Sequence, residues 1–447
     1  MKRDLGNEKI SVLLLDQSVP AILSMLVAAI YNLVDRMFIG RINSLGLTAI
    51  GITMPFQIVQ MAFVLLIGVG GSTLISIKYG EGKIKSAENI LINSFIFFII
   101  TELLVTILCL IFINPIFSLL GVSNNVYGLA KDYIVVMLLG GIPGLTGYCL
   151  NNTVRSLGFS RNAMTYVLLS SVLNIILDAI FIFIFGWGVK GAAIATVISQ
   201  TLVTIFVLGF FIKSKGVPIK LRLNNLKVDF RVVKEVFSNG LPSFYMQVVG
   251  TVVGILLNRF IISYGGDYHL ASITIISSIG LFFSMFYYGV SQGAQPIIGY
   301  NFGAGKIERS IKTVYLTLIF ITFISILFMI VLELFPEFLV KFFTKDSGLI
   351  KLTVYNIKIY LLGLPFIGIH SISTTYFISI KKPRISSLLN ILKFGGIIIP
   401  LLYILPNFFG INGVYISNAL SDTISGIIAF VLLYIQLKNT RKEQNTL

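Results

Sequence analysis

Apolar residues form long runs along almost the whole chain, and short polar breaks separate one run from the next. A helix needs about 20 apolar residues to cross the hydrocarbon core of a bilayer. We expect membrane spans at residues 18–40, 48–77, 90–114, 130–150, 162–185, 190–212, 236–264, 270–300, 310–333, 352–379, 386–406 and 411–437. The pattern therefore predicts an all-α integral membrane protein with twelve transmembrane helices.

The composition agrees with burial in lipid. Hydrophobic residues make up 56% of the chain and charged residues only 12%, whereas a soluble domain carries roughly 25% charged residues. Cys109 and Cys149 each lie alone inside an apolar run, which favours simple packing over a disulfide or a metal site.

Basic residues are unevenly distributed between the two sides that the spans define. The net charge is +16, but Lys and Arg occupy short breaks and form no basic face, so we expect no nucleic acid partner. One side, which includes both termini, collects 25 of the 34 basic residues and the other side collects 9. Because cytoplasmic loops are enriched in Lys and Arg, both termini are expected in the cytoplasm.

The two halves of the chain carry similar motifs at a nearly constant offset. The segment 80–84 (GEGKI) matches 303–307 (GAGKI) at an offset of 223, and 141–143 (GIP) matches 363–365 (GLP) at 222. Six helices per half give both halves the same orientation, as in parallel repeats of transporters. We expect an N-terminal six-helix lobe (1–212), a cytoplasmic linker (213–234), a C-terminal six-helix lobe (235–437) and a cytoplasmic tail (438–447).

Two acidic residues of the first lobe lie deep in apolar spans and have polar neighbours. A charged side chain at the bilayer centre costs about 2.5–3.5 kcal/mol on insertion scales, so such residues are functional candidates. Asp35 shares a helix face with Asn32, and Asp178 shares one with Asn174. Together with Thr196 of the next span, these oxygens suit reversible protonation or binding of Na⁺.

The second lobe has different chemistry at the matching positions. Asn258 and Pro400 stand where the first lobe has Asp35 and Asp178, and Asp422 is the deep acid of that half. Lys393 is expected to extend to the inner membrane surface. In the first lobe, Glu102 has no polar partner that the sequence reveals. Coupling chemistry is therefore expected mainly in the first lobe.

Several chemical motifs are absent from the sequence. There is no Gly-x-x-x-x-Gly-Lys-Ser/Thr loop for ATP, no His/Cys cluster for a metal or haem, and no nucleophile elbow of a hydrolase. We therefore expect no enzyme activity and no cofactor beyond a coupling ion, H⁺ or Na⁺.

These features together resemble the multidrug and toxic compound extrusion (MATE) exporters of the MOP superfamily. The resemblance rests on the two six-helix halves, Pro20 and Asp35 in the first helix, Asn174 and Asp178 in the fifth, Thr196 in the sixth, and the repeated Gly-x-Gly-Lys turns. It covers about residues 10–437. The chain is nearer the DinF and MepA-like branch than the NorM branch, whose acids in helices seven and ten it lacks.

The resemblance implies roles for individual residues. Asp35, Asn174, Asp178 and Thr196 match the cation or proton site of the DinF-type branch. Pro20 matches a proline implicated in bending of the first helix. Tyr31, Asn32, Asn151 and Asn152 correspond to polar lining of the same cavity.

The expected function is secondary active efflux of drugs or metabolites, by antiport with H⁺ or Na⁺ and alternating access of two lobes. The expected partners are the lipid bilayer and small, cationic, lipophilic molecules, with the chain acting as a monomer in a bacterial plasma membrane. A lipid-linked oligosaccharide flippase of the same superfamily is the alternative. A polytopic membrane enzyme or receptor is a remote one, because it requires a catalytic cluster or a soluble domain.

Overall fold

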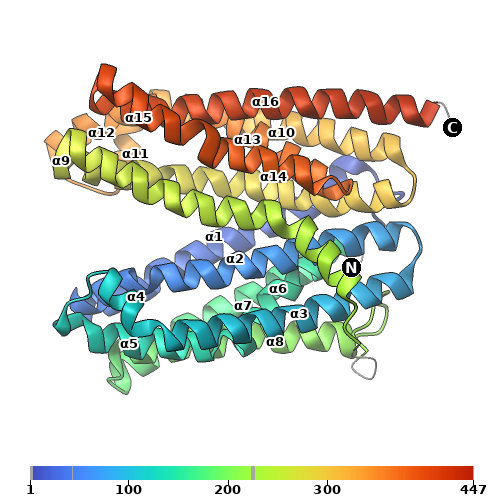
Figure 1. The fold of residues 1–447 in the computed structure, drawn as a ribbon, viewed down its shortest axis with the longest axis horizontal. Coiled ribbons are helices and arrows are strands. Elements are labelled where there is room, and N and C mark those ends of the chain that lie inside the picture. Colours follow the sequence, from blue (N-terminus) through green and yellow to red (C-terminus); the bar gives the residue numbers. More distant parts are fainter. Residues whose placement is uncertain (1–3, 43, 223–226, 446–447) are drawn as a thin grey trace. The chain divides into compact units, whose positions relative to one another are not determined.

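The computed structural model describes residues 4–42, 44–222 and 227–445, and all regular structure in these ranges is helical (Figure 1). The helices are α1 (Ile10–Ile42), α2 (Ser44–Gly80), α3 (Ile84–Ile111), α4 (Ile113–Leu119), α5 (Asn124–Leu139), α6 (Gly141–Ser156), α7 (Ser160–Asp178), α8 (Gly188–Ile212), α9 (Phe230–Gly303), α10 (Ile307–Leu334), α11 (Pro336–Lys341), α12 (Ser347–Tyr360), α13 (Leu364–Ser379), α14 (Pro383–Ile391), α15 (Ile398–Phe409) and α16 (Ile411–Asn445). Two π-helical segments, η1 (Ala179–Ile184) and η3 (Leu392–Ile397), follow α7 and α14.

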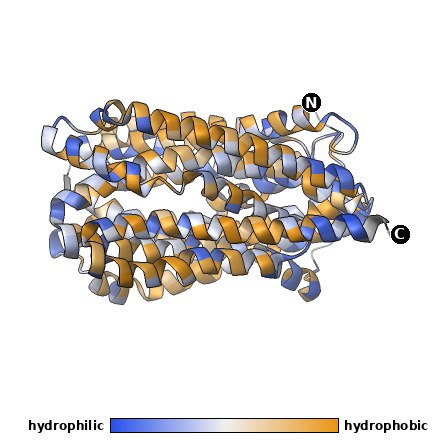
Figure 2. Ribbon diagram, turned by 90° about the horizontal axis from the view of Figure 1, so that it is seen from above, coloured by the Kyte–Doolittle hydropathy of each residue, from blue (hydrophilic) through white to orange (hydrophobic). Residues whose placement is uncertain are grey.

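The described residues account for the expected membrane spans. Nine helices are long and apolar enough to cross a bilayer, and the bent pairs α5–α6 (56°) and α12–α13 (46°) raise the number to eleven. The long helix α9 is interrupted at Gly266 (φ 70°, ψ −169°), so its two arms correspond to the seventh and eighth expected spans. Hydrophobic residues fill the middle of most helices and hydrophilic ones gather at turns and ends (Figure 2). The twelve-helix prediction is confirmed.

The repeated glycine motif forms the same turn in both halves. Gly82 (φ 73°) joins α2 to α3, and Gly305 (φ 71°) joins α9 to α10. In each turn the glycine N–H donates to a carbonyl three residues back, and the following lysine N–H donates to one five residues back. Only glycine adopts this positive φ readily, which explains why the motif is found at both places.

The helices group into two compact units. Unit 1 contains Leu23–Phe244 and the described residues before Gly6, and unit 2 contains Gly6–Ile22 and Tyr245–Leu447. The first turns of α1 are therefore grouped with unit 2, and the first turns of α9 with unit 1. The expected lobes have other boundaries, and they stay a prediction.

Each unit has its own helix packing. In unit 1, α6 packs against α2 and α8, and α2 also packs against α3, around buried side chains such as Leu66, Phe98 and Phe211. In unit 2, α13 packs against α16, α10 and α14, and these helices lie side by side in Figure 1. The same long apolar sequences therefore supply both the lipid-facing surface and the interior of each unit.

Two helices of unit 1 approach each other closely at a pair of glycines. A Cβ at Gly240 of α9 would collide with the backbone carbonyl of Leu66 in α2, and a Cβ at Gly70 would collide with the carbonyl of Val236. Small residues at such crossings let the backbones of membrane helices pack by van der Waals contact.

We predict that Gly240→Ala lowers the stability of the folded protein by about 1–3 kcal/mol, the usual cost of overpacking. Gly254→Ala in the same helix is the matched control, because no atom beyond the adjacent backbone of its own helix lies within 4 Å of the position of its Cβ. Thermal unfolding in detergent measures the effect, and equal melting temperatures of the two variants would contradict this packing.

Candidate cation-coupling site in unit 1

Asp178 is the most deeply buried of the predicted coupling residues. It is the last residue of α7, its side chain is 0% exposed, and neither carboxylate oxygen has a hydrogen-bond partner among the described residues. The π-helical segment η1 begins directly after it. π-helical turns are rare and often mark functional sites, since their hydrogen bonds depart from the α-helical pattern.

Asp35 lies close enough to Asp178 for the two carboxylates to interact electrostatically. It comes from the middle of α1, is 8% exposed, and its Oδ1 has no partner within the described ranges. Burying two like charges near each other among apolar helices is strongly unfavourable unless a proton or a cation compensates them. The structure therefore brings together the two acids that the sequence singled out.

Asn174 and Thr196 extend this group from α7 to α8. The Asn174 Nδ2 lies 3.5 Å from the Thr196 Oγ1, a long hydrogen bond between the two helices. The Asn174 Oδ1 is buried and has no partner in the described part of the chain. Carboxylate, amide and hydroxyl oxygens are the donors that hard cations prefer, so this set fits either a proton or an alkali cation.

The sequence did not point to Tyr133, which also belongs to this group. Tyr133 of α5 lies within electrostatic range of both Asp35 and Asp178, and Gln57 of α2 lies beside its hydroxyl. Tyr31 has Asp35, Tyr133 and Tyr148 as electrostatic neighbours, so this predicted lining residue is close to Asp35. A tyrosine inside an apolar span carries no special signal, and only its proximity to both acids in the fold identifies Tyr133.

The other predicted lining residues make local contacts. Asn32 is exposed and donates to the carbonyl of Ala28 in its own helix. The Asn151 Nδ2 donates to the carbonyl of Ala163, while its buried Oδ1 has no partner in the described segments. The Asn152 Nδ2 donates to the carbonyl of Tyr148 at 3.2 Å. None of the contacts found for these residues reaches Asp35 or Asp178 in the described ranges.

Pro20 lies inside α1, which continues as one helix from Ile10 to Ile42. It belongs to the part of α1 that is grouped with unit 2, whereas Asp35 belongs to the part grouped with unit 1. A proline has no N–H for the carbonyl four residues earlier, which weakens the helix at that point.

Glu102 has a polar partner that the sequence did not reveal. The Gln60 side chain of α2 donates a short hydrogen bond to the Glu102 Oε1, and the other carboxylate oxygen has no partner among the described residues. A Cβ at Gly141 of α6 would collide with the same carboxylate. The sequence does not reveal this partner of Glu102, because Gln60 belongs to a different helix.

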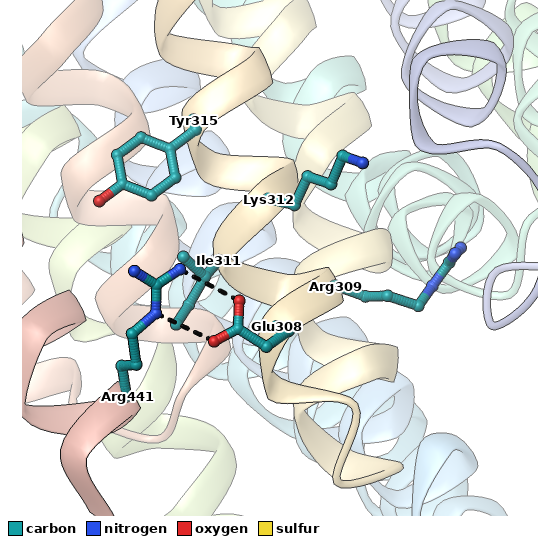
Figure 3. A pocket seen from close by; sticks show the side chains of 6 residues that line it. All are labelled: Glu308, Arg309, Ile311, Lys312, Tyr315 and Arg441. Carbon is teal, nitrogen blue, oxygen red and sulfur yellow. Dashed lines mark hydrogen bonds and ion pairs between the residues drawn. The ribbon is translucent and has the colours of Figure 1, made fainter. Parts of the chain in front are cut away.

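A surface pocket of about 300 Å³ lies in unit 2. Its lining residues are Glu308, Arg309, Ile311, Lys312, Tyr315 and Arg441 (Figure 3). The Arg441 guanidinium donates to both Glu308 carboxylate oxygens, at 3.0 and 3.1 Å. This contact lowers the pKa of the Glu308 carboxyl below its usual value. The pair joins α10 to α16, but no predicted site residue lines the pocket.

Comparison with known proteins shows the family and the fold of this chain. The MatE family model matches residues 20–180 and 242–404. The chain is 29% identical over 423 residues to the multidrug export protein MepA of Staphylococcus saprophyticus, and the match covers 94% of this chain and 92% of that protein. MepA of Staphylococcus aureus is also 29% identical, over 425 residues, with coverage of 94% and 92%.

Solved structures share the fold. A crystal structure of MATE in the bent conformation superimposes with a TM-score of 0.92 at 22% identity, covering 98% of both chains. An outward-facing multidrug resistance MATE transporter of the MOP superfamily gives a TM-score of 0.90 at 23% identity, covering 97% of this chain and 99% of that one. The all-α fold and the predicted resemblance are thus confirmed, and the chain belongs to the MatE family, whose members are membrane transporters and not enzymes.

Proposed function

We propose that this transporter exports small, cationic, lipophilic drugs or metabolites in exchange for inward H⁺ or Na⁺. The single observation that carries the proposal is the pair of buried acids, Asp35 and Asp178, of which Asp35 Oδ1 and both Asp178 oxygens have no hydrogen-bond partner in the described ranges. The MepA relatives are multidrug export proteins, which supports the substrate class. A carboxylate in a largely apolar site attracts organic cations and disfavours anions.

Asp35 and Asp178 alternate between two states in this proposal. In one state they hold H⁺ or Na⁺, and Asn174 and Thr196 contribute oxygens to the same site. In the other state the cation has left towards the cytoplasm and a cytoplasmic substrate binds. Because the charge at Asp35 differs between the two states, the preferred shape of α1 differs as well. In this proposal the helix bends at Pro20.

The membrane potential is a sufficient driving force when the exported substrate is neutral, whereas one-for-one exchange of a monovalent cationic substrate moves no net charge and depends on the concentration gradient of H⁺ or Na⁺. Moving one charge across 100 mV yields about 2.3 kcal/mol. At about 1.36 kcal/mol per tenfold change in an equilibrium, one inward cation maintains roughly a 50-fold gradient of a neutral substrate. In the proposed cycle, the two lobes give substrate and cation access to each side of the membrane in turn. Both termini lie in the cytoplasm of a bacterial cell in this proposal.

We predict that Asp35→Asn and Asp178→Asn each abolish active efflux, since an amide cannot exchange a proton and holds a cation weakly. Accumulation of an ethidium-like dye in expressing cells measures this. Asp132→Asn in α5 is the matched control, because that acid is exposed. The control should export dye like the unchanged chain; normal efflux by both site variants would contradict the coupling proposal.

Two further conditions in the same assay identify the coupling ion. Efflux should stop either when Na⁺ is replaced by a large organic cation or when the proton gradient is collapsed. Dye export that persists under both conditions would rule out either ion as the driver. No export of any organic cation tested, despite normal folding, would instead favour the oligosaccharide flippase.

We predict that Thr196→Val weakens the cation site without changing its size. Hydrogen bonds to charged groups contribute about 1.5–3 kcal/mol, so the concentration of driving cation at half-maximal transport should rise about tenfold or more. Thr201→Val is the control, because the Thr201 hydroxyl donates within its own helix to the Val197 carbonyl. Equal cation dependence of the two variants would remove Thr196 from the site.

A further inference from the structure

Unit 2 contains a buried ion pair between Lys393 and Asp422. The Lys393 Nζ lies 3.0 Å from the Asp422 Oδ1, and each side chain is only 8% exposed. Lys393 belongs to the π-helical segment η3 and Asp422 to α16. The expectation that Lys393 reaches the inner surface was therefore wrong, because its ammonium has a carboxylate partner in the interior.

The surrounding helices hold this pair firmly. The second oxygen of Asp422 accepts a hydrogen bond from the Asn418 Nδ2 at 3.2 Å. The Ser421 hydroxyl donates to the backbone carbonyl of Lys393 at 3.0 Å, which ties α16 to η3 a second time. Gly363, at the start of α13, leaves room for Asp422, since a Cβ there would lie 2.5 Å from the Asp422 Cβ.

The other groups that face the pair are mostly tyrosines. Tyr288 of α9 is an electrostatic neighbour of Lys393, and Tyr287 of α9 and Tyr360 of α12 are neighbours of Asp422. His370 of α13 also faces Lys393, and its Nε2 lies 3.3 Å from the Leu389 carbonyl. The Phe394 ring lies 5.2 Å from the ammonium. Among these neighbours no second carboxylate competes for Lys393.

Such a pair carries no net charge. Either the proton stays on the ammonium and both groups are charged, or it moves to the carboxylate and both are neutral. Breaking a buried pair by removing one partner is costly, because the remaining charge is left uncompensated. Asp422 is therefore compensated from within the chain, whereas Asp178 in unit 1 has no such partner in the described ranges.

We propose that Lys393 acts as a tethered cation that fills a monovalent-cation site at Asp422, and that it thereby keeps unit 2 out of ion coupling. Lys393 then determines the number of cations moved per substrate, and its removal makes Asp422 available to bind H⁺ or Na⁺. The proposal rests on the proposed cation antiport. It goes beyond that function by explaining why one of the two related halves contributes no coupling ion.

The direct test counts titrating carboxyl groups and bound Na⁺ on purified full-length protein, independently of transport. Infrared difference spectra between neutral and acidic pH report carboxyl protonation, and binding of radioactive Na⁺ reports the metal ion. Compared with the unchanged chain, the single variant Asp422→Asn should lose no carboxyl signal and no bound Na⁺. Lys393→Met should add either one carboxyl signal or one Na⁺, and Lys393→Met with Asp422→Asn should lose that addition.

The matched control is Lys382→Met, which removes an exposed ammonium that donates to Gln436 at 2.9 Å. It should leave both counts unchanged. A folded Lys393→Met protein with the counts of the unchanged chain would overturn the proposal.

Lys393→Met leaves a bare buried acid and can fail to fold, so the double variant provides a second test. Replacing both partners by neutral groups of similar shape is commonly tolerated. In proteoliposomes, this double variant should move the same number of cations per substrate as the unchanged chain. A loss of one cation per substrate would show that Asp422 already takes part in coupling and would contradict the proposal.

Failure of the antiport itself gives a different result. In that case no variant, including Asp35→Asn, changes the number of cations moved with substrate, while the infrared and Na⁺ counts still report on Lys393 and Asp422. The two proposals can therefore fail separately.

Discussion

A buried charge without a partner is the constraint on which this structure depends. In the apolar interior of a membrane helix bundle, a carboxylate needs a proton, a cation or a basic side chain beside it. The two units meet this need in different ways. In unit 1, Asp178 has no partner in the described ranges, whereas in unit 2 Asp422 has Lys393 at 3.0 Å. In our proposals, the acid that depends on an exchangeable cation couples ion movement to transport, and the acid with a tethered cation does not.

The backbone is adapted to these charged groups in both units. A π-helical segment follows Asp178 directly, and another contains Lys393. Glycines also make room for buried acids, with Gly141 against Glu102 and Gly363 against Asp422. These two glycines stand at matching positions of the sequence repeat, 222 residues apart. The matching glycines each face a buried acid, but the two acids come from non-equivalent helices, α3 and α16.

The architecture could be predicted from the sequence because it depends on properties that are local in the chain. Apolar length determines where a helix can cross a bilayer, and positive φ at Gly82 and Gly305 determines the repeated turns. Asp35 and Asp178 were also identifiable, since an acid in an apolar run is rare enough to stand out. The division of α1 between unit 1 and unit 2 could not be predicted from the sequence, because one continuous helix carries residues of both units.

Partnerships between helices could not be predicted in the same way. Gln60 pairs with Glu102 across 42 positions, and Lys393 pairs with Asp422 across 29. Tyr133 lies near the acids only because the fold brings α5 within electrostatic range of Asp35 and Asp178. Each of these residues is unremarkable within its own span, and a single sequence holds no record of which spans are neighbours. The sequence therefore indicated which charges matter, and the fold shows how each is compensated.

The central claim is that substrate and coupling cation exchange through the acids of unit 1. Its most direct test measures ion release when an ethidium-like dye is added to purified protein in weakly buffered, low-salt solution. A pH indicator and a Na⁺ electrode follow the two candidate ions. The account predicts that dye binding releases H⁺ or Na⁺ from the unchanged chain and releases neither from Asp178→Asn. Dye binding to the unchanged chain without release of either ion would contradict it.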